Sequence, residues 1–272
     1  MTISKFGFDN TARTFYVPSD WVDRKLKIAL VGCGGTGSSI LTELFQMFGI
    51  LTKLGCDGFE VTAYDGDLVS ESNVFRQNFW QHDVGNNKAD VLITRFNQFG
   101  GVNWKSKPVF FTGEMAVTEE YDLLITAVDK AFVRYEIGRA LDASVKRALW
   151  LDMGNDNHQS NVLLGNASRQ KFYGEKRLPT PFELFGSQWE EAAKTEVDTA
   201  SCSTEEAIQK QTFGINGMTA RSAASMLLFP LLRFGKLEHH GLFIDLHQAE
   251  ITKMPVDPLQ WSFYGYQEEN IN

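Results

Sequence analysis

The sequence predicts an α/β fold in which helices flank a mostly parallel sheet. Three observations support this class. Between residues 26 and 155, short apolar runs alternate with amphipathic stretches of helical length. A glycine-rich turn joins the first predicted strand to the first predicted helix. Beyond Gly154 the alternation gives way to consecutive strands, which predicts an antiparallel C-terminal extension of the sheet.

The first half of the chain is expected to contain five strands. LKIALVGCG (26–34) is a continuous apolar run, and apolar side chains recur at helical spacing in the residues that follow it. The next predicted elements are a strand at 59–67, a helix at 87–99, a strand running through 109–111, a strand at 121–129, a helix at 131–144 and a strand at 147–155. Such alternation produces parallel strands that are covered on both faces.

The second half follows a different pattern. Residues 159–166 are expected to pair with the preceding strand, 169–203 to form a long irregular crossing segment, 204–235 to form helix interrupted at Gly214 and Gly217, and 241–256 to form an antiparallel hairpin or bent strand. Repeats and a clear linker are absent. The sequence therefore predicts a single domain over 1–272, with an N-terminal arm (1–25), a nucleotide-binding half (26–155) and a second half (156–272).

Composition excludes several classes of protein. The net charge of −8 argues against binding to a nucleic-acid backbone. An apolar run of about 18 residues and a basic-then-apolar leader are both missing, so neither a membrane span nor a signal peptide is expected, and the cytoplasm is the default location. The three cysteines, Cys33, Cys56 and Cys202, are far apart in the sequence. They suggest reduced thiols and exclude a Cys-x-x-Cys zinc pair.

The segment VGCGGTG carries the first functional motif. Gly32, Gly34 and Gly37 follow the G-x-G-x-x-G pattern at the junction of a strand and a helix, with Gly35 in the same loop. Such glycines permit a tight turn, the approach of a phosphate to the backbone and close helix–strand packing, and the helix N-terminus attracts an anion. A Rossmann-like nucleotide site is therefore expected, although a glycine turn used only for packing is the alternative.

Acidic residues close the next strand. Asp65 is placed at the carboxyl end, where a carboxylate can accept hydrogen bonds from ribose hydroxyls. It follows Gly37 by 28 residues, which is longer than the roughly 20 residues usual for a dinucleotide site. Asp67 is either a second ligand of the sugar or a metal, or a turn residue that bonds its own backbone.

Cations follow these acids, and a further acid ends the fourth strand. Arg76 and Lys88 can both meet phosphate oxygens, whereas a nicotinamide cofactor carries only a diphosphate and does not need them. The alternative is that each is a solvated surface residue. Asp129 can hold Mg²⁺ against phosphates, cap the helix that begins near Ala131, or do both.

Together these motifs resemble the ThiF/MoeB and ubiquitin-activating superfamily. The resemblance covers residues 26 to 140 most clearly and rests on five blocks in order: the loop Gly32-Cys33-Gly34-Gly35-Thr36-Gly37, the run from Asp65 and Asp67 through Val69 to Asn73, the pair Arg76-Gln77, Lys88, and Asp129 followed by Arg134. It implies a domain that binds ATP and Mg²⁺ and adenylates the C-terminal carboxylate of a ubiquitin-fold protein. By that motif, Asp65 would hold the ribose, Asn73, Arg76, Gln77 and Lys88 would bind phosphates, and Asp129 would bind magnesium.

The resemblance also implies partners. A small ubiquitin-like or sulfur-carrier protein would dock on the second half, a conjugating-type acceptor protein would follow, and the chain would form a homodimer whose N-terminal arm reaches the partner's nucleotide, with Arg13 as a candidate contact. The sequence is also similar to ThiF-related proteins of bacterial PRTRC cassettes. Members of the superfamily that form a thioester often carry their cysteine where Cys202 stands.

Cys202 is therefore a candidate nucleophile. It precedes a predicted helix, whose N-terminal dipole can lower the pKa of a thiol; a small buried residue is the alternative. Cys33 and Cys56 are interpreted as structural, and His239 and His240 as a solvated turn rather than a metal pair. Two other functions remain open: a nicotinamide-dependent oxidoreductase, for which the glycine loop and Asp65 suffice, and a non-catalytic nucleotide-binding scaffold.

Overall fold

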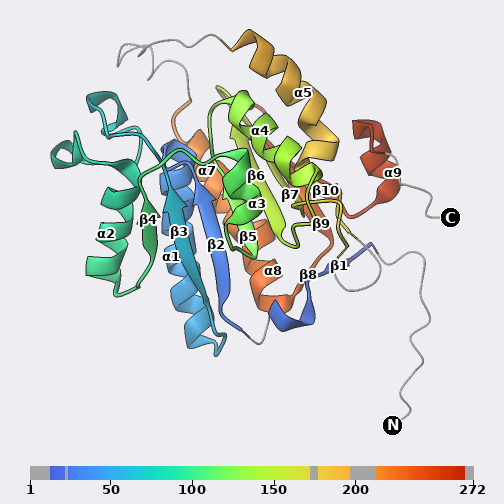
Figure 1. Ribbon diagram of the computed structural model, residues 1–272, viewed down its shortest axis with the longest axis horizontal. Coiled ribbons are helices and arrows are strands. Elements are labelled where there is room, and N and C mark those ends of the chain that lie inside the picture. Colours follow the sequence, from blue (N-terminus) through green and yellow to red (C-terminus); the bar gives the residue numbers. More distant parts are fainter. Residues whose placement is uncertain (1–12, 22–23, 172–176, 197–211, 267–272) are drawn as a thin grey trace.

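A computed structural model describes residues 13–21, 24–171, 177–196 and 212–266. In this part of the chain an eight-stranded mixed sheet has the order β10-β9-β7-β6-β5-β2-β3-β4, and β1 and β8 form a separate two-stranded sheet (Figure 1). The strands are β1 Phe15–Tyr16, β2 Leu26–Val31, β3 Phe59–Tyr64, β4 Lys105–Lys107, β5 Leu123–Thr126, β6 Leu149–Asn155, β7 Gln159–Asn166, β8 Lys236–Leu237, β9 His239–Asp245 and β10 Glu250–Pro255.

The sheet contains a parallel and an antiparallel part. β4, β3, β2, β5 and β6 pair in parallel, whereas β7, β9 and β10 extend the sheet in antiparallel register from β6. The predicted α/β class with an antiparallel C-terminal extension is confirmed. Since the parallel strands all end on one side, we call that side the carboxyl edge of the sheet and the opposite side the amino edge.

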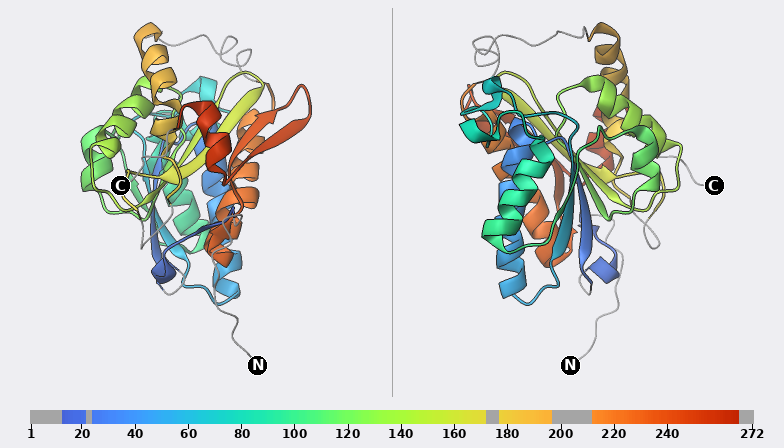
Figure 2. Two further views of the ribbon diagram at one scale, coloured as in Figure 1. Left: turned by 90° about the vertical axis from the view of Figure 1, so that its right-hand side faces the viewer. Right: turned by 60° about the vertical axis from the view of Figure 1, so that its left-hand side comes forward.

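Helices cover both faces of the sheet (Figures 1 and 2). On one face lie α1, α2, α7 and α8, and on the other lie α3, α4 and α5. The helices are α1 Gly35–Lys53, α2 Lys88–Gly100, α3 Gly113–Thr118, α4 Ala131–Asp142, α5 Pro181–Thr195, α7 Ile215–Ser222, α8 Phe229–Phe234 and α9 Pro258–Trp261, with the π-helix η4 Ala223–Leu228 between α7 and α8. Short 3-10 helices are η1 Ser19–Trp21, η2 Glu71–Asn73, η3 Gln81–Asp83 and η5 Ser262–Tyr264.

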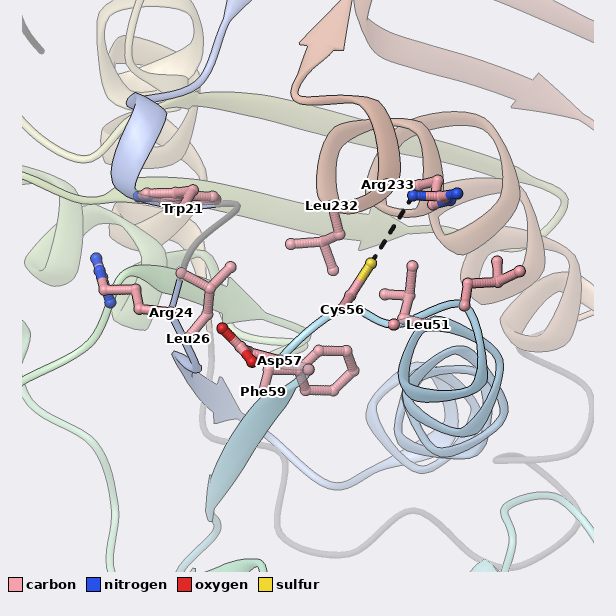
Figure 3. A pocket seen from close by; sticks show the side chains of 12 residues that line it. Trp21, Arg24, Leu26, Leu51, Cys56, Asp57, Phe59, Leu232 and Arg233 are labelled. Carbon is pink, nitrogen blue, oxygen red and sulfur yellow. Dashed lines mark hydrogen bonds between the residues drawn. The ribbon is translucent and has the colours of Figure 1, made fainter.

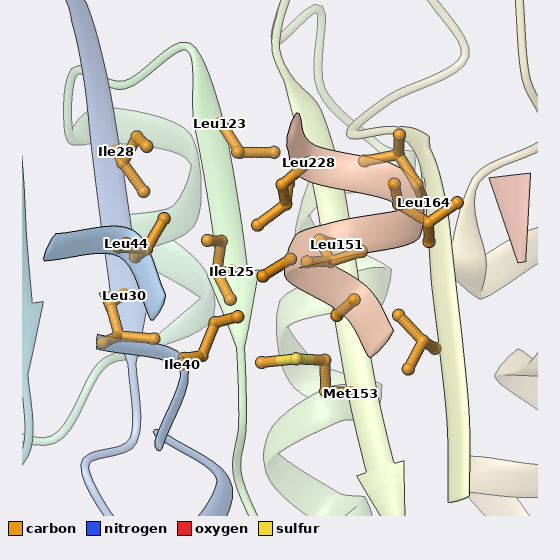
Figure 4. Close-up of a cluster of buried hydrophobic side chains, with 14 of the residues drawn as sticks. Ile28, Leu30, Ile40, Leu44, Leu123, Ile125, Leu151, Met153, Leu164 and Leu228 are labelled. Atoms are coloured by element: carbon orange, nitrogen blue, oxygen red, sulfur yellow. The ribbon is translucent and has the colours of Figure 1, made fainter. Parts of the chain in front are cut away.

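The core follows from the two-residue period of the strands. In β2, Ile28 and Leu30 face α1 and η4, whereas Ala29 and Val31 join the apolar cluster on the side of α3 and α4. Figure 4 shows side chains of β2, β5, β6 and β7 meeting those of α1 and η4 in the first of these clusters. The central strands β5 and β6 are buried on both faces because both faces are covered there, which explains the continuous apolar runs in the sequence.

Three element predictions were wrong. The helix interruption expected at Gly217 does not occur, because this residue lies within α7. The third strand ends at Lys107 and not at 109–111, because Pro108 lacks a backbone N–H and the Val109 N–H turns back to the Lys107 carbonyl at 2.8 Å. Within the segment expected to be irregular, α5 forms from Pro181. Its start was readable, since Thr180 and Glu183 make a capping box around the proline.

The histidine pair was also interpreted wrongly. His239 and His240 are the first residues of β9 and not a solvated turn. His240 is fully buried, and its Nδ1 lies 2.7 Å from the Leu164 carbonyl oxygen. Among the described residues, none of the helices is both long enough and apolar enough to span a bilayer.

Candidate functional site

The glycine loop lies at the carboxyl edge, where β2 turns into α1. Gly32 has a φ of +87°, and a Cβ there would lie 2.7 Å from the Ala127 carbonyl oxygen. A Cβ on Gly37 would lie 1.9 Å from the Gly32 carbonyl oxygen, so only glycine lets the helix start this close to the strand. In contrast, a Cβ on Gly34 would meet only the Gln77 amide nitrogen at 3.9 Å. The backbone at Gly34 is therefore open to a ligand.

Asp65 lies beside this loop. One of its carboxylate oxygens accepts from the Cys33 N–H at 2.6 Å and the other from the Asp67 N–H at 2.8 Å. Burial raises the pKa of Asp65, and these two hydrogen bonds oppose that shift by stabilising the charged form. Burial also raises the pKa of the Cys33 thiol, which is inaccessible to solvent. Cys33 therefore acts as a packing residue that also orients the aspartate through its backbone.

The segment between β3 and α2 folds back on itself and brings Lys88 to this position. The Asn87 side-chain amide donates to the carbonyls of Asp65 and Asp67 at 2.8 and 3.0 Å, and the Lys88 N–H donates to the Asp67 carbonyl at 3.0 Å. Lys88 Nζ lies 3.0 Å from an Asp67 carboxylate oxygen. The ammonium group, on a largely buried side chain, is thus fixed against Asp67, which lies three residues beyond the end of β3.

Asn73, Arg76 and Gln77 occupy the same closed segment. The Asn73 side chain accepts from the Ser70 N–H at 2.9 Å, the Arg76 Nε donates to the Ser72 carbonyl at 3.3 Å, and the Gln77 N–H donates to the Asn73 carbonyl at 2.9 Å. Gln77 Oε1 is buried and has no hydrogen-bond partner in the described structure. The Gln77 side chain thus has its Nε2 nearest to Gly34 and a buried Oε1 whose hydrogen bonding a ligand or an ordered water would complete.

This segment is held over the start of α1. The Asn78 N–H donates to the Ser38 hydroxyl at 3.3 Å, and the Asn78 amide donates to the Ser38 carbonyl at 3.0 Å. Arg95 of α2 supports it from the other side, with its guanidinium 2.7 Å from Asp83 and 3.7 Å from the centre of the Trp80 ring. The Asn73–Gln77 motif is therefore fixed relative to the glycine loop.

Asp129 follows β5 at the same edge, and its side chain is exposed. The alternative in which it caps α4 is not realised, because the Glu196 carboxylate accepts from the Ala131 and Phe132 N–H groups at 2.5 and 3.1 Å. The Asp129 loop is instead held by Arg134, whose guanidinium donates to the Val128 carbonyl. The carboxylate of Asp129 therefore remains available at the carboxyl edge.

Comparison with known proteins gives the family of the chain. A family model described as the ThiF family matches residues 23–228. The chain belongs to the ThiF family. No curated protein matches it in sequence.

ThiF-family membership is accompanied by similar solved structures. PaaA shares 16% identity at a TM-score of 0.61, with 88% of this chain and 75% of that chain covered. Escherichia coli MccB, solved with ATP, shares 14% identity at a TM-score of 0.57, with 88% and 66% covered. The same protein solved with MccA-N7isoASN shares 16% identity at a TM-score of 0.58, with 87% and 66% covered. The chain thus spans slightly less than two thirds of MccB, and at these identities the likeness concerns the fold.

Two side chains that sequence reasoning missed, Asn216 and Asn155, also lie at the glycine loop of this ThiF-family chain or beside it. Asn216, in the first turn of α7, accepts through Oδ1 from the Thr36 hydroxyl at 2.9 Å and from the Asn155 amide at 2.7 Å. A Cβ on Gly35 would lie 2.4 Å from its amide nitrogen. Nothing in the local sequence marks Asn216, because its partners are distant in the chain.

Other predicted residues lie elsewhere or were not reached. Arg13 lies at the amino edge, where its guanidinium is 3.2 Å from Asp257, and it is not close to the glycine loop within this chain. Cys202 falls outside the described residues. The described residues contain no group of three or more His, Cys, Asp or Glu side chains arranged for a metal ion.

A cavity of about 200 Å³ lies at the amino edge, away from the glycine loop. Figure 3 shows it between the starts of β2 and β3, the end of α1 and α8. Arg233 approaches the Cys56 sulfur at 4.0 Å there, and Leu232 and Phe59 supply apolar lining. The predicted site residues do not line this cavity, so it is separate from the candidate site at the glycine loop.

Proposed function

We propose that the protein is an ATP-dependent adenylyltransferase that activates the C-terminal carboxylate of a small ubiquitin-like or sulfur-carrier protein. The observation that carries the proposal is the convergence at the carboxyl edge of the glycine loop, the buried Asp65 and the fixed cation Lys88. The ThiF-family match supports it. The half comprising 26–155 would bind the nucleotide, and 156–272 would receive the carrier protein.

Charge explains why acids and cations alternate in this site. The attacking carboxylate and the α-phosphate are both anionic, and further negative charge develops on pyrophosphate as the Pα–O–Pβ bond breaks. Lys88 and Arg76 would neutralise phosphate oxygens. Asp65 would accept from the ribose hydroxyls, and the N–H groups of Cys33 and Asp67 would favour its charged form against the effect of burial, which raises its pKa.

The polar groups of the closed segment would orient the phosphates. Gln77 lies beside Gly34 with its Nε2 nearest to the loop, so this amide would donate to a phosphate oxygen, while the unpartnered Oε1 would accept from an ordered water or a ligand hydroxyl. Asn73 would act from the same segment. Asp67 would hold the Lys88 ammonium in place, since the two groups already form an ion pair.

A magnesium ion fits the same edge. Mg²⁺ prefers one or two carboxylates together with phosphate oxygens and water, and Asp129 offers one exposed carboxylate in a loop fixed by Arg134. When bound, the ion would neutralise phosphate charge. The residue's part is to supply that carboxylate without capping α4, a role that Glu196 takes.

Transfer to a thiol would complete the proposal. The Cys202 thiolate would attack the acyl carbon of the adenylated carrier, so that the C–S bond forms and AMP leaves, and a conjugating-type acceptor would then take the acyl group. We also propose a homodimer and a cytoplasmic location. Mass spectrometry of wild type and Cys202→Ser after incubation with ATP and a carrier tests the thioester, because only wild type should gain the carrier's mass.

The main test is ATP–pyrophosphate exchange with small ubiquitin-like proteins encoded beside this chain. Wild type should exchange label in the presence of the cognate carrier, and Arg76→Ala and Asp129→Ala should each lose at least roughly tenfold, because each would remove a charge that stabilises the transition state. Arg169→Ala is the matched control, since Arg169 pairs with Asp142 at the amino edge. Exchange that is undiminished in both site variants would refute the proposal.

Nucleotide binding separates this proposal from its rivals. Calorimetric titration with ATP and with NADH should give heat with ATP alone. Tight NADH binding without ATP binding would favour an oxidoreductase. Binding of ATP without exchange on any carrier would favour a nucleotide-binding scaffold.

A further inference from the structure

Asn216 connects three distant parts of the chain at the carboxyl edge. Its carboxamide oxygen accepts both from Thr36, the second residue of α1, and from Asn155, the last residue of β6. Thr36 is largely buried and Asn155 is half-buried. The first turn of α7 is itself fixed there, because the Thr212 N–H donates to the Asn157 carbonyl at 2.8 Å.

The amide end of Asn216 packs against the glycine loop. Gly35 has no positive φ, so its backbone would tolerate a side chain, yet a Cβ would lie 2.4, 2.7 and 3.0 Å from three atoms of the Asn216 carboxamide. Glycine is therefore needed at position 35 to leave space for the Asn216 side chain, and not to allow an unusual backbone conformation. The contact is specific to the side chain, because no backbone atom appears among these neighbours.

The loop needs lateral support at this point. Gly34 precedes α1 as its N-cap and makes no side-chain capping hydrogen bond, so the first N–H groups of the helix are left for an anion. A loop rich in glycine is costly to order, and a hydroxyl anchored in the first turn restrains it. Thr36 supplies that hydroxyl, and Asn216 supplies its acceptor.

The same contacts extend to the loop that carries Asp129. Arg134 donates to the carbonyls of Val128 and of Met153, the latter at 3.1 Å, and Met153 lies two residues before Asn155 in β6. The end of β6 is thus bonded on one side to the Asp129 loop and on the other to Asn216. The C-terminal end of β6 therefore positions both the glycine loop and the Asp129 loop, which would meet the phosphates.

We propose that Asn216 is a positioning residue that holds the glycine loop in its nucleotide-binding geometry, so that the site is completed from the second half of the chain. The inference rests on the proposed function for the identity of the nucleotide. Asn216 acts through Thr36 and does not itself contact the reacting groups.

The test is a double-mutant cycle on ATP affinity, measured by calorimetry on the full chain. Asn216→Ala and Thr36→Val should each weaken ATP binding by roughly fivefold to thirtyfold, the range expected from one or two buried neutral hydrogen bonds. The double variant should be no weaker than the worse single variant, because both substitutions remove the same contact. Thr36→Ser retains the hydroxyl and should bind ATP like wild type, as should the control Met218→Ala in the exposed part of the same helix.

Gly35→Ala provides a second line of evidence. Alone it should weaken ATP binding by displacing the Asn216 carboxamide, whereas in the Asn216→Ala background it should cause no further loss, because the three atoms in its way are gone. Thermal unfolding of each variant without nucleotide separates folding from positioning. Lowered melting temperatures with unchanged ATP affinity would overturn the proposal, as would singles whose effects on affinity simply add.

These outcomes are distinct from failure of the proposed function. If wild type binds ATP but shows no pyrophosphate exchange, the adenylation proposal falls while the positioning role is still decided by the affinities. If wild type binds no ATP, both fall.

Discussion

Removing the Arg134 guanidinium should be among the most damaging single changes to this fold. Arg134 and Asp152 are both buried, and Nε lies 3.1 Å from the Asp152 carboxylate. The same guanidinium donates to the Val128 and Met153 carbonyls. Arg134→Ala therefore leaves a buried carboxylate without its cation and removes the donor to the part-buried Val128 carbonyl and the buried Met153 carbonyl.

The magnitude follows from these contacts. Breaking a buried ion pair by removing one partner costs about 3 to 5 kcal/mol of unfolding free energy. Asp152 keeps one hydrogen bond, from the Thr126 hydroxyl at 2.6 Å, which places Arg134→Ala towards the lower end of that range. Since each kcal/mol shifts the melting temperature of a chain of this size by roughly 2 to 4 °C, a fall of about 6 to 16 °C is expected.

Urea unfolding followed by tryptophan fluorescence and by circular dichroism measures this loss. The comparison variant is the double substitution Arg134→Met with Asp152→Asn, which removes both charges and should be more stable than Arg134→Met alone. An Arg134→Ala protein that unfolds within about 1 kcal/mol of wild type would show that the buried pair does not have the cost assigned to it.

Three further results are expected. Burial lowers the pKa of His240 from 6.5 to about 4, so the folded protein favours the neutral imidazole. This group should not affect the free energy of unfolding above pH 6.5, and that free energy should fall by up to about 3 kcal/mol as the pH is lowered to 4. His240→Gln should reduce this fall when the stability is measured as a function of pH. Gly37→Ala should abolish ATP binding because its Cβ would collide with a backbone carbonyl, whereas Gly49→Ala in the same helix meets nothing within 4 Å and should bind ATP normally and unfold at equal or higher temperature. Lys88→Met should weaken the affinity for ATP, measured by calorimetry, roughly tenfold to a hundredfold with little change in melting temperature. An affinity equal to that of wild type would exclude a contact between Lys88 and a phosphate.

Much of the fold could be predicted from the sequence because the local residue patterns favour the same strands and helices that the tertiary packing stabilises. The strand at 26–34 and the helix after it were predicted from the spacing of their apolar residues and from the glycines between them, where the packing leaves no room for a Cβ. The predicted elements were wrong where one or two residues had more influence on the backbone than the surrounding pattern of apolar and polar residues. Pro108 ended a strand that its apolar neighbours suggested, and the capping box at Thr180 began a helix in a region judged by composition alone.

The candidate site was predictable only in part. Residues within one contiguous motif, such as Asp65 and Lys88, could be placed because the chain between them closes on itself. Asn216 could not, since its contact with Thr36 depends on how α7 returns to α1 across 180 residues. The burial of His240 likewise depends on β7, which pairs with β9 and supplies the Leu164 carbonyl.

The antiparallel seam between β6 and β7 has a consequence for folding. These strands are paired from Leu149 with Asn166 to Asn155 with Ser160, in the middle of the sheet. A fragment ending at residue 155 would expose β6 as a long apolar strand with unsatisfied backbone groups, which favours aggregation. The proposed nucleotide-binding and carrier-binding halves would therefore not be separable modules, and the eight-stranded sheet cannot be completed until β9 and β10 have been synthesised.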